Sequence, residues 1–254
     1  MFTRRDHLDS LAIGLMLLLC FLWAFQQITI KVANAGVSPV LQAGIRSIIA
    51  VVALGAWMMT RKIRPFQNDD TWIPGVIAGL LFAIEFVFIY WALEYTAVSR
   101  AIIFIYTAPF IVALGIHWLI PNEELKRIQV FGMVLAFAGV IIAFREGFTI
   151  STGNEWIGDL MCILSAFFWG ATTVLIRASK LSNIEPSRTL FYQLSVSALI
   201  LPPISLAMGE TGVTDISPVI LACLAFQGLI VAFASYLTWF WLIAHYPAAR
   251  LSAY

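Results

Sequence analysis

Long apolar segments constrain the fold of this chain more than any other feature of its sequence. A helix needs about 20 apolar residues to cross the hydrocarbon core of a bilayer. Eight segments reach about this length: 11–32, 38–59, 72–93, 99–120, 127–145, 157–178, 187–207 and 217–243. A ninth begins near Pro247. Because a helix satisfies its own backbone hydrogen bonds in lipid, the sequence predicts an all-α polytopic membrane protein with eight complete transmembrane helices and the start of a ninth.

The composition supports a bilayer as the solvent and excludes some functions. Of the 254 residues, 61% are hydrophobic and 11% are charged, whereas soluble domains carry about a quarter charged residues. The net charge of +1 offers no basis for binding nucleic acid. The histidines and cysteines show no metal-ligand spacing. We therefore expect the lipid bilayer and a small-molecule substrate as partners, and no metal or other cofactor.

Basic residues indicate the orientation of the chain. If the N-terminus is cytoplasmic, eleven of the fifteen lysines and arginines fall on the inner side: Arg4, Arg5, Arg61, Lys62, Arg64, Lys126, Arg127, Arg177, Lys180, Arg188 and Arg250. Short cytoplasmic loops are enriched in these residues. The sequence therefore predicts a cytoplasmic N-terminus.

An internal repeat divides the chain. FLWAFQQITIKVANAGVSPVLQ (21–42) is similar to AFFWGATTVLIRASKLSNIEPSR (166–188), and Trp23 and Lys31 match Trp169 and Arg177, each 146 positions later. We expect two units of about five helices, at 8–146 and 157–254. Because each unit has an odd number of spans, the second unit enters the membrane from the opposite side, as in the inverted repeats of many transporters.

The repeat also predicts where the second unit should end. Trp91 and Arg100 match Trp241 and Arg250, both 150 positions later. At this offset the second unit should reach about residue 295, but the sequence stops at Tyr254. We therefore expect either that the sequence is a fragment or that the protein lacks most of its last two helices.

Several motifs in this order resemble one transporter family. FLWAFQQITIKVANAGVSPVLQAGIR resembles the first two helices of EamA-type members of the drug/metabolite transporter superfamily, with Trp23, Lys31, Ser38, Pro39 and Arg46 in place. YTAVSRAIIFIYTAPFIVALG resembles the fourth helix of that family. LIPNEELKRIQVFGMVLAFAGVIIAF resembles the fifth, except that Asn122 replaces the usual glycine.

The resemblance implies a fold and a function. The fold would be ten helices in two inverted five-helix units, with both termini cytoplasmic. The function would be secondary transport of a small metabolite, such as an amino acid, a nucleotide derivative or a drug-like compound, across the bacterial inner membrane. Transport would be export or exchange coupled to an ion gradient, and the protein would not be an enzyme.

Two ionisable residues deep in the spans are the first candidates for a transport site. Arg46 and Glu85 each lie about eight residues from the outer end of a span, so at about 1.5 Å per residue both are about 12 Å deep. Intramembrane charges cost free energy to insert and are usually paired and functional. We expect an ion pair in which Glu85 exchanges a proton. The alternative is a structural pair that joins the second helix to the third.

Neutral polar residues complete the candidate site. In the first unit they are Gln26, Gln27, Tyr106 and Thr107. In the second unit they are Thr172, Thr173, Tyr192, Gln193 and Ser235. We expect an asymmetric site, charged in the first half and hydrogen-bonding in the second, with ordinary helix–helix hydrogen bonds as the alternative. Three deep tryptophans could line a cavity, but packing is their default role: Trp23, Trp169 and Trp239.

Two other functions remain open. An intramembrane enzyme would need a nucleophile, a metal set or two acids at depth, and the sequence has no GxSxG or HExxH motif and one deep acid, Glu85. A truncated protein could instead be inactive, or could work only as a homo-oligomer.

Overall fold

The computed structural model describes residues 8–120, 125–148, 153–246 and 251. Eight spans in these ranges are long and apolar enough to cross a membrane. Five are single α-helices in chain order: α1 (Ser10–Ala33), α2 (Pro39–Thr60), α3 (Trp72–Tyr95), α7 (Glu155–Ala178) and α8 (Pro186–Ala207). The predicted all-α membrane fold is confirmed. The ninth segment, near Pro247, lies almost wholly outside the described residues.

The other three spans change helix type along their length. The fourth consists of α4 (Val98–Ile105) and α5 (Ala108–Leu119), and the fifth of α6 (Arg127–Phe144) and the 3-10 helix Arg145–Phe148. The eighth consists of α9 (Pro218–Ala225), a π-helical segment (Phe226–Ser235) and α10 (Tyr236–His245). A second 3-10 helix, Lys180–Asn183, connects α7 to α8.

Proline explains the break in the fourth span. Pro109 lies at the start of α5, where its missing backbone N–H is tolerated. The chain turns at Tyr106 and Thr107, and the Thr107 hydroxyl donates a hydrogen bond of 2.6 Å to the carbonyl of Phe104. The span is therefore two helices joined by a turn, with irregular backbone at membrane depth.

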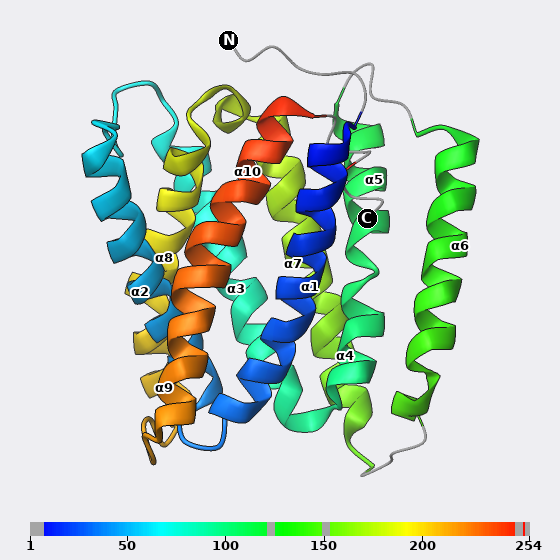
Figure 1. Cartoon of the computed structure of the whole chain (residues 1–254), viewed down its shortest axis with the longest axis vertical. Helices are drawn as coiled ribbons and strands as arrows, with labels where there is room; N and C mark the ends of the chain where they lie inside the picture. The colour runs from blue at the N-terminus through cyan, green and yellow to red at the C-terminus, as the bar shows by residue number, and fades with distance from the viewer. Residues whose placement is uncertain (1–7, 121–124, 149–152, 247–250, 252–254) are drawn as a thin grey trace.

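Matching helices of the two halves run in opposite directions. In Figure 1, α1 descends while α7 ascends, and α2 ascends while α8 descends. This is the inverted arrangement that the repeat requires. α3 is the most buried span and packs on α7 and α8, whereas α6 stands at the edge of the bundle with no buried residue.

Small residues allow α3 and α8 to approach closely. A Cβ atom added at Gly79 would lie 2.6 Å from the Cβ of Val196, and one added at Gly75 would lie 2.6 Å from the ring of Tyr192. Such contacts between small residues and bulky neighbours are typical of helix packing in membranes. The two halves of the chain are therefore in direct contact along α3.

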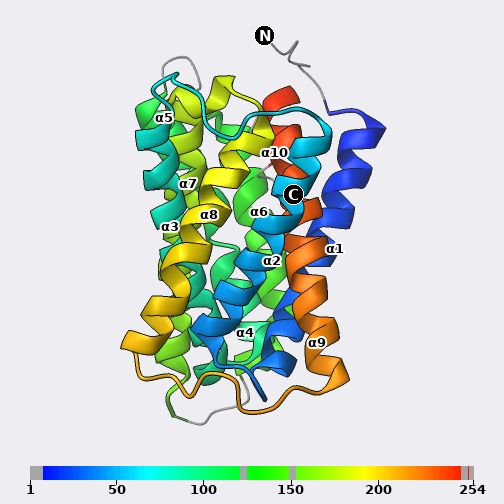
Figure 2. The same ribbon diagram turned by 90° about the vertical axis from the view of Figure 1, so that its left-hand side faces the viewer.

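Two connections meet at the lower end of the bundle (Figure 2). The α1–α2 and α8–α9 connections form an isolated bridge between Val37 and Val213, and the backbone N–H of Ser38 donates to the carbonyl of Gly212 at 2.9 Å. The carboxylate of Glu210 accepts the backbone N–H groups of Val40 and Leu41 at 3.0 and 3.1 Å. A residue that follows α8 thus caps the N-terminus of α2.

We expect replacement of Glu210 by alanine to destabilise the protein by about 1 kcal/mol, since two N–H groups at a helix N-terminus would lose their anionic acceptor. Thermal unfolding in detergent should show a midpoint lower by about 2–4 °C. The matched control is alanine at Asp215, an exposed acid in the same connection. Equal midpoints for the two variants would contradict a capping role for Glu210.

Candidate functional site

A cavity of about 160 Å³ lies between the two halves of the bundle. Residues of α1, α3 and the α4–α5 span line it from the first half, and residues of α7, α8 and α10 line it from the second. Seven residues predicted for the site are among them: Gln26, Gln27, Glu85, Tyr106, Thr172, Thr173 and Gln193. The cavity therefore brings together polar residues that are far apart in the sequence.

Glu85 is the charged group of this cavity. Its side chain is 8% exposed, and its Oε2 atom has no hydrogen-bond partner among the described residues. The Oε1 atoms of Gln27 and Gln193, on other walls of the cavity, are also buried without a partner there. A buried polar atom without a partner is costly. These three oxygens therefore lack a hydrogen-bond donor among the described residues.

The direct ion pair expected between Arg46 and Glu85 is not formed. Arg46 is fully buried, and its three guanidinium nitrogens have no hydrogen-bond partner among the described residues. Its guanidinium carbon lies 3.6 Å from the ring centroid of Phe86 and 5.8 Å from those of Phe82, Tyr90 and Tyr236. Aromatic faces stabilise this cation, so Arg46 lies behind the cavity wall rather than in it.

Tryptophans form part of the cavity wall, which is the role that the sequence left open beside packing. The ring of Trp23 contacts those of Trp169, Trp239 and Tyr236 edge to face, at centroid distances of 5.6–5.9 Å. All four residues line the cavity. The matching positions of Trp23 and Trp169 in the repeat were the sequence signal for this wall, whereas Tyr236 gave none.

Two other predicted residues lie beside the cavity rather than on its wall. Ser235 accepts a hydrogen bond of 2.9 Å from the indole N–H of Trp23 and donates one of 2.6 Å to the carbonyl of Val231. The Thr107 hydroxyl is occupied by the helix break described above. Ser235 therefore holds Trp23 in place, and Thr107 stabilises the turn.

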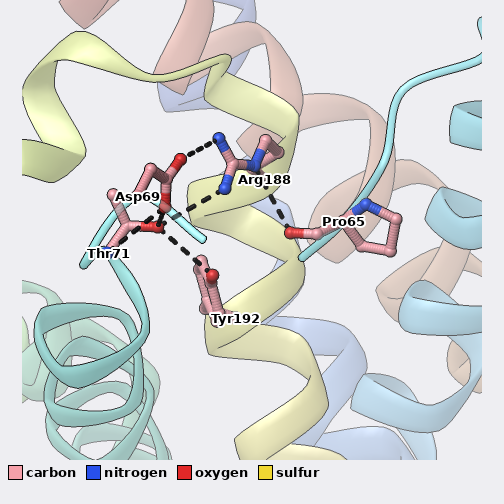
Figure 3. A network of polar contacts seen from close by, with 5 residues as sticks. All are labelled: Pro65, Asp69, Thr71, Arg188 and Tyr192. Atoms are coloured by element: carbon pink, nitrogen blue, oxygen red, sulfur yellow. Dashed lines mark hydrogen bonds and ion pairs between the residues drawn. The ribbon is translucent and has the colours of Figure 1, made fainter. Parts of the chain in front are cut away.

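Tyr192 belongs to a separate polar network at the upper end of the bundle (Figure 3). Its hydroxyl lies 3.3 Å from the Thr71 hydroxyl, which donates to Asp69 at 2.5 Å. Arg188 forms an ion pair with Asp69 at 2.7 Å and donates to the carbonyl of Pro65 at 3.3 Å. The hydrogen bonds from Arg188 and Thr71 lower the pKa of Asp69 to about 2. This network joins the α2–α3 connection to α8.

Comparison with known proteins gives the same fold and family. The sequence matches the EamA-like transporter family over residues 10–145 and 156–254. A protein from Archaeoglobus fulgidus named an uncharacterized transporter is 25% identical over 246 residues, which cover 94% of this chain and 82% of that protein. The uncharacterized transporter YoaV of Bacillus subtilis is 19% identical over 232 residues. The match covers 91% of this chain and 79% of YoaV.

A solved crystal structure supports the fold alone. It superimposes on this chain with a TM-score of 0.74 at 19% sequence identity. The match covers 97% of this chain and 83% of the other. The arrangement of helices around the cavity is thus shared with an experimentally determined protein.

The upper network predicts a pH-dependent contribution to stability. Because the pKa of Asp69 is lower in the folded state, its contribution is full above about pH 4 and is lost as the pH falls through about 2. We expect asparagine at Asp69 to cost about 1 kcal/mol at pH 7, a value reduced for solvent screening because 31% of the side chain is exposed. Thermal unfolding of the parent protein and the variant at pH 7 and at about pH 2 measures this cost.

The matched control is asparagine at Asp70, which is the next residue. Its ion pair with Lys180 spans 2.8 Å, but the two side chains are 81% and 62% exposed. Such a surface pair contributes little, so this variant should unfold like the parent protein at both pH values. A cost for the Asp69 variant that persists unchanged at pH 2 would contradict the assignment to the carboxylate.

Proposed function

Since the chain belongs to the EamA-like transporter family, we propose that it is a secondary transporter that moves a small metabolite across the bacterial inner membrane. The observation that carries the proposal is the cavity between two inverted halves, which contains one buried carboxylate. Transport is export or exchange coupled to an ion gradient. In this proposal, the two repeats consist of residues 8–146 and 157–254.

The distribution of basic residues supports a cytoplasmic N-terminus. The upper end in Figure 1 carries the α2–α3 and α7–α8 connections, which hold Arg61, Lys62, Arg64 and Lys180. Arg188 lies in the first turn of α8 at the same end. Short loops rich in lysine and arginine remain in the cytoplasm. The lower end, which carries the Val37–Val213 bridge, then faces the outside.

Glu85 is the group that couples transport to protons. Glu85 is buried against a largely apolar cavity, where a negative charge needs a proton or a cation to balance it. The ionisable groups around it are Arg46 on α2, Tyr90 on α3 and Tyr236 on α10, with Cys20 and Tyr106 on the facing walls. The carboxylate binds a proton and the substrate in turn, so that a proton moves in one direction and the substrate in the other.

Irregular helices next to the cavity provide the means of opening. The turn at Tyr106 and Thr107 adjoins the cavity, and Tyr236 directly follows the π-helical segment Phe226–Ser235. Broken helices of this kind surround the substrate sites of many transporters, and rocking of one half against the other exposes the site to each side in turn.

Replacing Glu85 with glutamine should abolish the pH dependence of transport, because the amide keeps the shape of the side chain but cannot take part in proton exchange. The protein is reconstituted in liposomes that contain a pH-sensitive dye. Pools of amino acids, amines, nucleosides and drug-like compounds are then added. With the parent protein, an active pool should change proton flux at least fivefold between pH 6 and 8.

The matched control is glutamine at Glu94, an exposed acid near the end of the same helix that accepts a hydrogen bond from Asn34. This variant should keep the parent pH profile. A Glu85 variant with the parent profile would exclude the proton role, and the absence of flux with every pool would refute secondary transport coupled to protons.

A further inference from the structure

The chemistry of the cavity identifies a class of substrate. Building on the proposed transport function, we propose that the substrate is a small protonated amine with an apolar, ring-sized body. Its ammonium group pairs with Glu85, and its body lies against the wall that includes Trp23, Trp169 and Trp239. Charge, hydrogen-bonding capacity, aromatic lining and volume each support this assignment.

The charge of the cavity favours a cation. Among the described residues that line it, Glu85 is the only charged one. Its Oε2 atom is buried without a partner. The nearest candidate counterion, Arg46, does not line the cavity and is covered by the ring of Phe86. A carboxylate in this environment is stabilised by a cation that enters the cavity itself.

Hydrogen-bonding capacity favours a ligand that donates. The buried atoms of the cavity wall without partners among the described residues are all acceptors, the oxygens of Gln27, Glu85 and Gln193. Two wall hydroxyls already donate within α7, that of Thr172 to Phe168 at 2.8 Å and that of Thr173 to Trp169 at 3.1 Å. Because amide groups can turn over, the ionised form of Glu85 decides the argument, since an ionised carboxylate only accepts hydrogen bonds.

The same features oppose anionic and zwitterionic substrates. A carboxylate or phosphate group requires a cation or several free N–H groups. The wall contains no lysine, arginine or histidine among the described residues, so an anionic group would meet no cation there. An amino acid or a nucleotide derivative would therefore place an uncompensated negative charge beside Glu85.

Aromatic rings and volume specify the rest of the ligand. Ring faces attract an ammonium group within about 6 Å, tryptophan most strongly. The cavity of about 160 Å³ is close to the volume of about 150 Å³ at which an engineered apolar cavity binds benzene. One ring with a short amine chain matches this space, whereas a nucleotide does not.

Binding of 2-phenylethylamine to the purified full-length protein in lipid nanodiscs tests the proposal. Its uncharged counterpart, 2-phenylethanol, has nearly the same size. Calorimetry at pH 7.5 should show the amine binding at least tenfold more tightly than the alcohol. In the Glu85→Gln variant this preference should fall below threefold, while the affinity for the alcohol stays within threefold of the parent value and reports an intact cavity.

Two further variants refine the result. Glu85→Asp keeps the charge and should keep the preference for the amine, and Glu94→Gln should bind both compounds as the parent protein does. Equal affinity for amine and alcohol in the parent protein, no binding of either, or tighter binding of 3-phenylpropanoate would overturn the proposal.

The outcome is separable from that of the transport assay. If an amino-acid or nucleoside pool drives Glu85-dependent proton flux while the amine fails to bind, the substrate class is wrong and transport stands. If the amine binds through Glu85 but no pool drives flux, the binding site stands and proton-coupled transport is refuted.

Discussion

The absence of water from the hydrocarbon core is the constraint on which this structure depends. It forces the backbone into helices that satisfy their own hydrogen bonds, and it directs polar side chains away from lipid and toward one another. The result is a bundle in which a few polar side chains line a largely apolar cavity between the two inverted halves. Glu85 lies in that interior because no lipid-facing position on α3 could hold a carboxylate at this depth.

The same constraint explains how the two deep charges, Arg46 and Glu85, are placed. A buried charge can be compensated by an opposite charge, by hydrogen bonds or by aromatic faces. Arg46 is surrounded by four rings, and the carboxylate of Glu85 is left for the cavity. This separation makes the site chemically asymmetric. An ion pair would have neutralised both groups and left the cavity without a charge to recognise a ligand.

Besides the helix packing along α3, polar contacts join the halves at both ends of the bundle. At the lower end, Glu210 caps α2 and the Val37–Val213 bridge joins two connections. At the upper end, Arg188 and Asp69 join α8 to the α2–α3 connection (Figure 3). A cavity that opens to alternate sides would need these contacts to break at one end at a time. The contacts named at the lower end are hydrogen bonds, and those at the upper end are hydrogen bonds and one ion pair.

The sequence by itself determined the class of fold, the number of described spans, their order and their inverted directions, because span length and hydrophobicity are properties of each segment alone. It also placed Gln27, Glu85 and Gln193 at depths where they could meet. Only the tertiary structure decided that these three side chains point toward the cavity. A depth along a helix does not specify a direction around it. Three features depend on how the helices rotate and pack against one another: the rings around Arg46, the position of Tyr192 in the upper network and the tryptophan wall. That packing is a property of the whole bundle.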